Sequence, residues 1–248
     1  MTVRQGTVTG EPGRVSYIRL VITRSENLPG CAFSDIPGVR NFRDAGGVGS
    51  LRRGALYRSG ALNAMPPEGA PYLKALGLRS VIDLRSTPEV TAGPDLRHDL
   101  GYEHSHFPVF AEQRWPEDQR ELYPSMAEHA GRSTVAIIRR LIVPGALPAL
   151  VHCASGKDRT GVTIAIVQTL LNASEAEITE DFLRSNTSLG LTETSAAART
   201  GHGTRPVTAT HLLHAMIWIR SHYGSVPDYL LAHGAKEAEL QALHTALT

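Results

Sequence analysis

The ten residues HCASGKDRTG, from His152 to Gly161, contain the side chains of this chain best suited to chemistry. Cys153 and Arg159 are separated by five residues, enough for a loop to wrap once around a tetrahedral anion with its backbone N–H groups turned inward. Gly156 would ease the backbone geometry of such a loop. A helix that starts near Arg159 would add its positive end beneath the anion. The segment therefore predicts a phosphate cradle with a cysteine at its base.

The same positive field favours a thiolate at Cys153, the form in which a cysteine acts as a nucleophile. The thiolate would attack phosphorus and form a cysteinyl-phosphate, which water then hydrolyses to inorganic phosphate. Arg159 would hold two phosphate oxygens with its planar guanidinium, and Thr160 would donate its hydroxyl to the sulfur. We expect His152 to shape the loop by hydrogen bonding rather than to act as a base. The substrate is expected to contact four further loop residues, Ala154, Ser155, Gly156 and Lys157.

Composition argues against several other classes of function. The chain of 248 residues has 25 Lys and Arg against 24 Asp and Glu, and this near balance argues against a general nucleic-acid binder. The early apolar run Tyr17 to Ile22 is interrupted by Arg19 and is too short for a membrane span or a signal peptide. We therefore expect a cytoplasmic protein without stable membrane insertion, with export by a route that has no readable signal peptide as the open alternative. The histidine pairs lack a third ligand nearby, so we expect no metal and no organic cofactor.

The order of the expected elements predicts an α/β fold with a central, mainly parallel sheet flanked by helices. Short apolar strands are expected at residues 55–58, 80–84 and 149–152. Helical periodicity or capping predicts helices at 67–76, 133–143, 162–171, after Ser174, and at 208–222, 226–233 and 236–247. The strongest of these signals is Ser174 with Glu177, which together form a capping box. Residues 188–206 are small and polar and are expected to form a surface loop.

Domain organisation follows from the absence of a composition shift along most of the chain. Residues 1–30 begin with several glycines and continue into a β-rich stretch, so we expect an N-terminal extension with a strand that packs on the domain. Residues 31–248 are expected to form a single catalytic domain. Within that domain, residues 93–132 are polar and rich in Pro and His, and no element is predicted there.

The loop HCASGKDRTG resembles the signature loop of cysteine-dependent tyrosine and dual-specificity phosphatases. Its GKDRTG part is similar to a bacterial branch called the tyrosine phosphatase 3 family. Other segments resemble that family in the same order: NFRDAGG at 41–47, LYRSG at 56–60, VIDLRS at 81–86 and YGSVPDYL at 223–230. The resemblance covers residues 35–247. It implies the fold of these phosphatases and activity on phosphotyrosine in proteins, with phosphoserine, phosphothreonine or phosphoinositides as further substrates.

A general acid is needed to protonate the departing oxygen of the substrate. Related phosphatases use an Asp on a separate loop, but here Trp115-Pro116 is followed by Glu117 and Asp118. The resemblance points instead to Asp158 inside the cradle, with Asp83 at the end of its strand as a second candidate.

Several of these residues also have a structural interpretation. Asp158 could stabilise the loop by pairing with Lys157 or Arg159, and an Asp at a strand end such as Asp83 often accepts backbone hydrogen bonds. Arg43 and Asp44 are expected either at the rim of the substrate pocket or in an internal ion pair that holds the NFRDAGG loop.

Two other functions compete with a phosphatase. One is a catalytically silent module that binds phosphorylated partners, and the other is a sulfur transferase with a similar cysteine loop. A binding module needs no thiolate, and a sulfur transferase does not require Arg at the sixth position after Cys. The presence of Cys153, Asp158, Arg159 and Thr160 together therefore favours a phosphatase.

Overall fold

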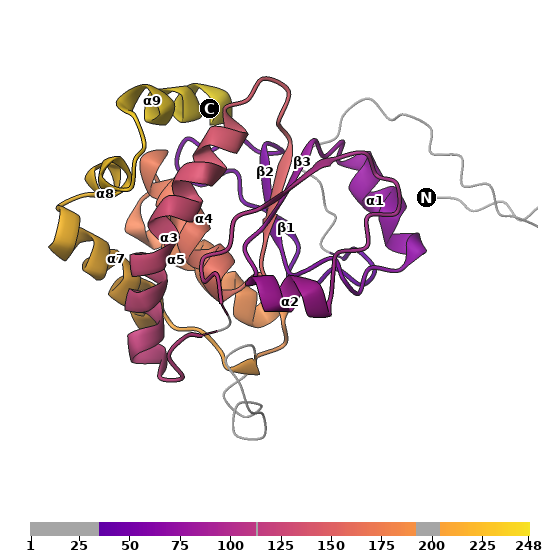
Figure 1. Ribbon diagram of the computed structural model, residues 1–248, viewed down its shortest axis with the longest axis horizontal. Helices are drawn as coiled ribbons and strands as arrows, with labels where there is room; N and C mark the ends of the chain where they lie inside the picture. Colours follow the sequence, from indigo (N-terminus) through magenta and orange to yellow (C-terminus); the bar gives the residue numbers. More distant parts are fainter. Residues whose placement is uncertain (1–34, 113, 192–203) are drawn as a thin grey trace, which may run out of the picture.

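The computed structural model, which describes residues 35–112, 114–191 and 204–248, contains one mixed sheet in that part of the chain (Figure 1). The strand order is β1-β2-β5-β3-β4. The strands are β1 Arg43–Asp44, β2 Leu56–Ser59, β3 Ser80–Asp83, β4 Glu103–His106 and β5 Ala149–His152. Neighbouring strands are parallel except for β1, which pairs with β2 in the antiparallel direction. The predicted α/β fold with a mainly parallel sheet is confirmed.

The register places three strand ends side by side. Ser59 of β2 and Asp83 of β3 both pair with His152 of the central strand β5. In open parallel sheets, ligands bind beyond the carboxyl ends of the strands. The segment that follows His152 therefore starts at the edge where a binding site is expected.

Helices lie on both sides of the sheet, with α1 on one side and α3, α4 and α7 on the other (Figure 1). The helices are η1 Pro67–Gly69, α1 Ala70–Ala75, α2 Thr87–Ala92, α3 Gln119–Leu141, α4 Asp158–Leu170, α5 Glu175–Ser188, α7 Ala209–Tyr223, α8 Val226–Ala232 and α9 Glu237–Leu247. The expected helices over 67–76, 208–222, 226–233 and 236–247 agree with these bounds to within two residues. Ser174 and Glu177 form the predicted capping box of α5.

Alternation along the strands separates two apolar clusters. Leu56 and Val151 belong to the larger cluster, on the side of α3 and α4, whereas their neighbours Tyr57 and Leu150 belong to the smaller one. Successive strand side chains point to opposite faces, so each strand contributes to both cores. Fully burying one such aliphatic side chain is worth about 1.5–3 kcal/mol relative to leaving it exposed.

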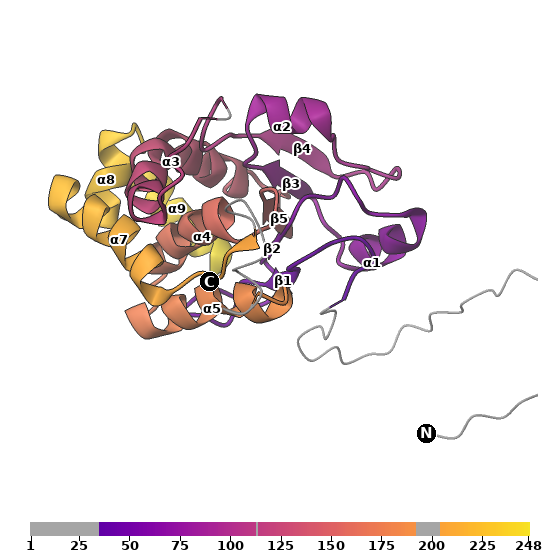
Figure 2. The same cartoon turned by 90° about the horizontal axis from the view of Figure 1, so that it is seen from below.

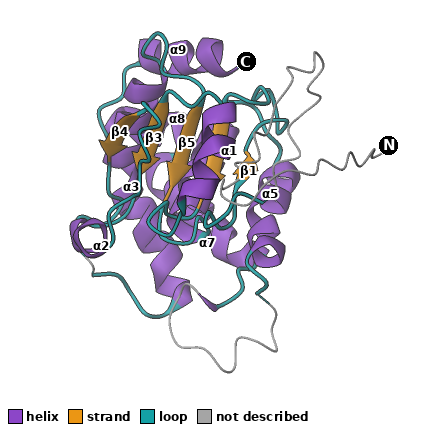
Figure 3. Ribbon diagram, turned by 90° about the vertical axis from the view of Figure 1, so that its right-hand side faces the viewer, coloured by secondary structure: helices purple, strands orange, loops and turns teal. Residues whose placement is uncertain are grey.

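Helix α4 is buried along most of its length, from Asp158 to Gln168. It lies against α5 on the same side of the sheet as α7 (Figures 2 and 3). A helix surrounded by protein needs apolar residues on most sides, which explains the stretch from Val162 to Val167, where Thr163 is the one polar residue. The surrounding helices and the sheet hold its N-terminus at the carboxyl end of β5.

Four elements differ from the sequence-based expectation. Strand β1 lies in the NFRDAGG segment that was expected as a loop, and the other three lie between residues 84 and 132. Helix α3 begins at Gln119 instead of Ser133, with Asp118 accepting a hydrogen bond from the Arg120 N–H as its N-cap. The residues after Ser86, for which no element is predicted from the sequence, form the short helix α2, and the segment 93–132 contains β4. Helix α2 has no buried residue and β4 is at most partly buried, so neither segment has an apolar face that the sequence alone could show.

The expected N-terminal extension, residues 1–30, lies outside the described residues, as do residues 192–203 of the expected surface loop. Among the described helices, none is both long enough and apolar enough to cross a membrane.

Candidate active site

The cradle predicted from the sequence connects β5 to α4. Cys153 directly follows β5 and has only 1% of its surface exposed, and Asp158 is the first residue of α4. Gly156 has a positive φ of 69°, and a Cβ atom there would lie 2.2 Å from the carbonyl oxygen of Ser59. Only glycine fits this position without displacing β2. The loop thus runs from a strand end to a helix N-terminus, an arrangement suited to anions.

Side chains from the NFRDAGG and LYRSG segments hold the loop through its backbone carbonyl groups. The Asn41 amide nitrogen donates to the carbonyl oxygens of Ser155, at 3.2 Å, and Gly156, at 2.9 Å. The Arg58 Nη2 atom donates to the same Gly156 oxygen at 3.0 Å. These bonds satisfy carbonyl groups that point away from the anion site, so the loop amides remain available on the other side.

A buried carboxylate on α5 holds two arginines in place behind the loop. Asp181 accepts from Arg43 Nε at 2.8 Å and from Arg58 Nη1 at 2.7 Å. Burial raises the pKa of Asp181, but the charges of Arg58 and Arg43 outweigh this and bring it to about 2. Burial and the nearby Arg58 lower the pKa of Arg43 to about 10. We call Asn41, Arg43, Arg58 and Asp181 the loop support.

Arg159 is held by a carboxylate in front of the loop. Its two terminal nitrogens contact the two carboxylate oxygens of Glu89, at 2.5 and 2.8 Å, and its guanidinium carbon lies 5.2 Å from the centre of the Trp115 ring. Burial raises the pKa of Glu89, but the hydrogen bonds and charge of Arg159 bring it to about 2. Burial lowers the pKa of Arg159, but Glu89 reverses this and raises it. The guanidinium is therefore charged and fixed in orientation.

The sequence reasoning missed Glu89. A signal was available, because Ser86 and Glu89 form a capping box at the start of α2 with Ser86 N donating to Glu89 Oε2 at 2.8 Å. That pattern indicates a helix, but it does not reveal that its glutamate reaches Arg159.

Asp158 has one oxygen bound to a buried tyrosine. The Tyr123 hydroxyl donates to Asp158 Oδ1 at 2.5 Å, and Asp158 Oδ2 lies 3.7 Å from Lys157 Nζ. Burial and the charge of Asp158 raise the pKa of Tyr123 well above its usual value of 10, so this phenol stays protonated and remains a donor. The Asp158 side chain is 12% exposed, and the residue lines the cavity in front of the loop. It combines a fixed carboxylate with access to that cavity.

Two expected loop contacts take a different form. The Lys157 side chain is buried and donates to the carbonyl oxygen of Arg205, and burial lowers its pKa. Thr160 Oγ1 is buried and has no hydrogen-bond partner within the described part of the chain, so the expected bond to the Cys153 sulfur is not formed there.

His152 contacts two carboxylates next to the loop. Its Nε2 atom lies 3.0 Å from Asp95 Oδ2, and its Nδ1 atom lies 3.8 Å from Asp83 Oδ1. Burial lowers the pKa of His152, but the hydrogen bond and charge of Asp95 and the charge of Asp83 raise it overall. These contacts agree with the expected role in shaping the loop.

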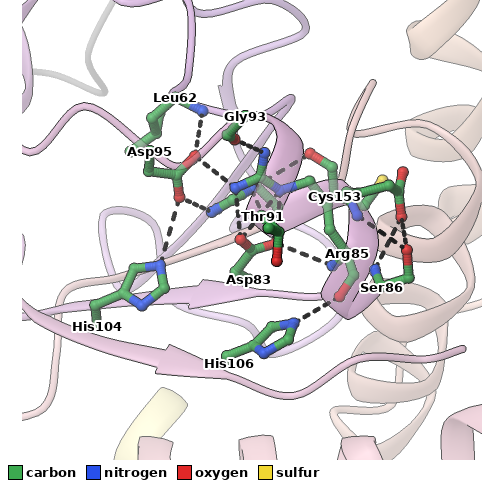
Figure 4. A network of polar contacts seen from close by, with 12 residues as sticks. Leu62, Asp83, Arg85, Ser86, Thr91, Gly93, Asp95, His104, His106 and Cys153 are labelled. Carbon is green, nitrogen blue, oxygen red and sulfur yellow. Dashed lines mark hydrogen bonds and ion pairs between the residues drawn. The ribbon is translucent and has the colours of Figure 1, made fainter. Parts of the chain in front are cut away.

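Three residues expected to contact substrate have internal partners instead. Asp83 is fully buried, and both its oxygens accept from Arg85, whose guanidinium lies between Asp83 and Asp95 (Figure 4). The Asp44 oxygens accept from two backbone N–H groups at 2.8 Å, and Arg43 belongs to the loop support. None of the three is among the described residues that line the cavity. These contacts favour the structural alternative for all three residues.

A cavity of about 390 Å³ opens in front of the loop. Four of its lining residues come from the cradle: Ala154, Ser155, Asp158 and Arg159. The others come from elsewhere in the fold: Arg40, Glu89, Phe110, Trp115, Leu122, Met126 and Thr204. The apolar wall comes from residues 110–126, a segment for which the sequence analysis predicted no elements. A cavity with a polar base and an apolar wall suits an aryl group that carries a phosphate.

The sequence has characterised relatives. Triple specificity protein phosphatase PtpB of Mycobacterium tuberculosis is 27% identical in a 276-residue alignment, and the match covers 87% of this chain and 99% of the relative. A tyrosine-protein phosphatase of Nostoc commune is 24% identical in a 217-residue alignment, and the match covers 78% of this chain and 74% of the relative.

Two solved structures are also similar. The core catalytic domain of the PP-IP phosphatase Siw14 of S. cerevisiae matches with a TM-score of 0.44 and 18% identity, over 79% of this chain and 96% of the other. TpbA of P. aeruginosa, in complex with phosphotyrosine, matches with a TM-score of 0.43 and 16% identity, over 81% and 98%. A model described as the tyrosine phosphatase family matches residues 34–248. Because that match spans nearly all of the chain, the protein belongs to the tyrosine phosphatase family and is an enzyme of that class.

Proposed function

We propose that this tyrosine phosphatase uses Cys153 to hydrolyse phosphotyrosine through a cysteinyl-phosphate. The observation that supports the proposal most strongly is the shared cavity, where the cradle of Cys153 meets the fixed guanidinium of Arg159. In the first step, sulfur attacks phosphorus in line, an S–P bond forms, and the bond from phosphorus to the tyrosine oxygen breaks. In the second, water attacks the same phosphorus, the S–P bond breaks, and inorganic phosphate leaves.

Asp158 is the proposed general acid. It donates a proton to the departing tyrosine oxygen, and in the second step it takes a proton from the attacking water. Tyr123 holds its Oδ1 atom, which leaves Oδ2 for proton transfer. Arg159 stabilises the charge that spreads over the phosphoryl oxygens in the transition state.

The apolar wall of the cavity supports phosphotyrosine as the preferred substrate. Phe110, Trp115, Leu122 and Met126 offer an aryl ring a surface that a serine or threonine side chain would not fill. The relative named a triple specificity phosphatase suggests wider specificity, so we also propose lower activity on phosphoserine, phosphothreonine and phosphoinositides.

The test is the replacement Cys153→Ser. We expect hydrolysis of p-nitrophenyl phosphate to fall to background, because a serine hydroxyl is a far weaker nucleophile than a thiolate, while inorganic phosphate and vanadate still bind the loop. A variant that keeps a rate near that of the wild type would overturn the proposal. A wild-type protein that binds phosphotyrosine peptides without hydrolysing them would instead establish the silent binding module.

A second measurement tests Asp158. Asp158→Asn should slow the hydrolysis of alkyl phosphates by about 10²–10⁴-fold, the usual contribution of a general acid. Aryl phosphates with good leaving groups need less protonation and should be slowed much less. Equal losses for the two substrate classes would remove Asp158 from this role.

Domain organisation and location are also proposals. The described strands form one sheet, which supports a single catalytic domain over residues 31–248. A protein shortened to those residues should keep its activity. The proposed cytoplasmic location rests on composition, and cell fractionation tests it.

A further inference from the structure

A second cavity of about 330 Å³ adjoins the catalytic one. Arg40, Glu89 and Ala154 line both cavities, so a substrate bound at the cradle can reach the second by passing along Arg40. We call the second space the side cavity. Its lining is more polar than that of the catalytic cavity and includes Arg85 and Asn63.

The backbone of Arg40 is fixed relative to the cradle. Its carbonyl oxygen accepts a hydrogen bond of 2.7 Å from the Gly60 N–H. The next residue, Asn41, has a positive φ of 55° and binds the loop through the carbonyl groups of Ser155 and Gly156. The side chain of Arg40 therefore starts from a constant position at the boundary between the two cavities.

The guanidinium of Arg40 differs from the others near the cradle. Arg43, Arg58, Arg85 and Arg159 each form an ion pair with a carboxylate. Arg40 is exposed and makes no side-chain hydrogen bond or ion pair with any residue that the structure describes. The Arg40 guanidinium lies beside a phosphate site, and no neighbouring carboxylate in the described part of the chain neutralises it. Such a group is suited to binding a second anion.

The acidic groups near the side cavity do not cancel this charge. The carboxylate of Glu89 is bound to Arg159. Asp83 and Asp95 are bound to Arg85 and do not line the side cavity in the described part of the chain, whereas Arg85 does. The Glu89 carboxylate lines the side cavity but is already paired with Arg159, so among the described residues the Arg40 guanidinium is the unpaired charge that an incoming anion would meet.

Resting on the phosphatase activity proposed above, we propose that the side cavity binds a second anionic group of the substrate through Arg40. The substrate is a peptide in which a Glu, an Asp or a second phosphorylated residue lies next to the phosphotyrosine. A peptide is favoured over an inositol phosphate because the wall with Phe110 and Trp115 suits an aryl ring, whereas an inositol ring has hydroxyl groups on all sides.

The experiment compares two phosphotyrosine peptides that differ only in Glu or Gln residues beside the phosphotyrosine. The measured quantity is the ratio of their kcat/KM values for the full-length protein. We expect the wild type to prefer the acidic peptide, and Arg40→Ala to reduce the ratio by about tenfold, the size of one charge-assisted hydrogen bond. Added salt should reduce the wild-type ratio in the same direction.

Arg79→Ala is the matched control, because Arg79 is exposed and precedes the opposite end of β3. It removes the same charge and should leave the ratio unchanged. Arg40→Glu should reverse the preference and favour the Gln peptide. An unchanged ratio in Arg40→Ala, or equal reductions in Arg40→Ala and Arg79→Ala, would overturn the proposal.

Two further outcomes separate the alternatives. If the wild type fails to hydrolyse p-nitrophenyl phosphate, the proposed function itself fails, whatever the peptide ratio. If hydrolysis of soluble inositol bisphosphate depends on Arg40 and the peptide ratio does not, the side cavity serves that headgroup and the peptide assignment is overturned.

Discussion

Two arginine–carboxylate pairs lie on opposite sides of the cradle. Behind the loop, the Arg58 and Asp181 side chains are 1% and 3% exposed. In front of it, the Arg159 and Glu89 side chains are 11% and 15% exposed and line the catalytic cavity. The rear pair binds the loop itself through Gly156, whereas the front pair faces the space that a substrate enters. The same two chemical groups therefore hold the loop in one place and present a guanidinium to ligands in the other.

The other partners of the two carboxylates explain this difference. Asp181 binds the buried Arg58 and the partly buried Arg43, and its removal would leave both guanidinium groups without a carboxylate partner in the described part of the chain. Glu89 also accepts from the backbone N–H and the hydroxyl of Ser86, so it stays in place as a helix cap when Arg159 turns toward a phosphate. We therefore expect the rear pair to stabilise the folded protein and the front pair to fix the orientation of the Arg159 guanidinium.

The largest expected effect is on stability, from Asp181→Ala. Removing one partner of a buried ion pair costs about 3–5 kcal/mol, because the remaining charges stay buried. Urea denaturation of the variant and the wild type measures the difference. Glu89→Ala is the control and should cost much less. Equal losses for the two variants would break the distinction between the front and rear pairs.

The next effect is on activity, from Glu89→Gln. An amide offers one acceptor oxygen in place of two, so Arg159 loses its two-point contact and its fixed orientation. We expect kcat/KM for p-nitrophenyl phosphate to fall about tenfold, since small losses of positioning are costly in catalysis. Urea denaturation serves as the second readout, and a loss of stability as large as that of Asp181→Ala would contradict the prediction.

Tyr123→Phe tests the remaining contact in front of the loop. Without the hydroxyl, Asp158 loses the donor to its Oδ1 atom and should be less well placed for proton transfer. We expect a decrease in kcat of about fivefold for alkyl phosphates, the size of one ordinary hydrogen bond, and a smaller one for activated aryl phosphates. The same substitution should have no further effect in an Asp158→Asn background. Additive losses in the double variant would show that Tyr123 acts elsewhere.

The front and rear of the cradle also differ in how far the sequence predicts them. The strand, the loop and the start of α4 follow one another within residues 149–161, so local spacing was sufficient to place Cys153, Asp158 and Arg159. The position of Arg43 behind the loop could not be predicted, because its partner Asp181 is 138 positions away in the sequence and belongs to no recognisable motif. For the same reason the sequence left Asp44 and Asp83 with both a substrate-facing and a structural interpretation, because polar residues in a motif do not reveal their partners.

The apolar wall of the catalytic cavity could not be predicted, because part of it comes from the polar segment 119–132 between β4 and β5. Residues 119–132 include Pro124 and many polar side chains, yet they form the first half of α3 and bury Leu122, Tyr123 and Met126. The buried positions Leu122, Tyr123, Met126, Ala127 and Ala130 recur at helical spacing, but two of them are alanines and Pro124 interrupts the run. Tertiary packing against α7 and α4 stabilises the helix, and only this packing brings Tyr123 to Asp158.

The smallest expected effect is on the pH dependence of stability. The pKa of Glu89 is about 2 in the folded protein and near 4.5 in a free side chain, so its ion pair stabilises the fold above pH 4.5 and this contribution is lost as the pH falls toward 2. The difference in unfolding free energy between the wild type and Glu89→Gln should be about 1 kcal/mol at pH 7, a size that allows for partial exposure. It should fall by more than half at pH 3, as denaturation at pH 7, 5, 4 and 3 would reveal. A difference that stays constant or grows on acidification would mean that Glu89 stabilises the protein as a cap alone, because only the ionised carboxylate can pair with Arg159.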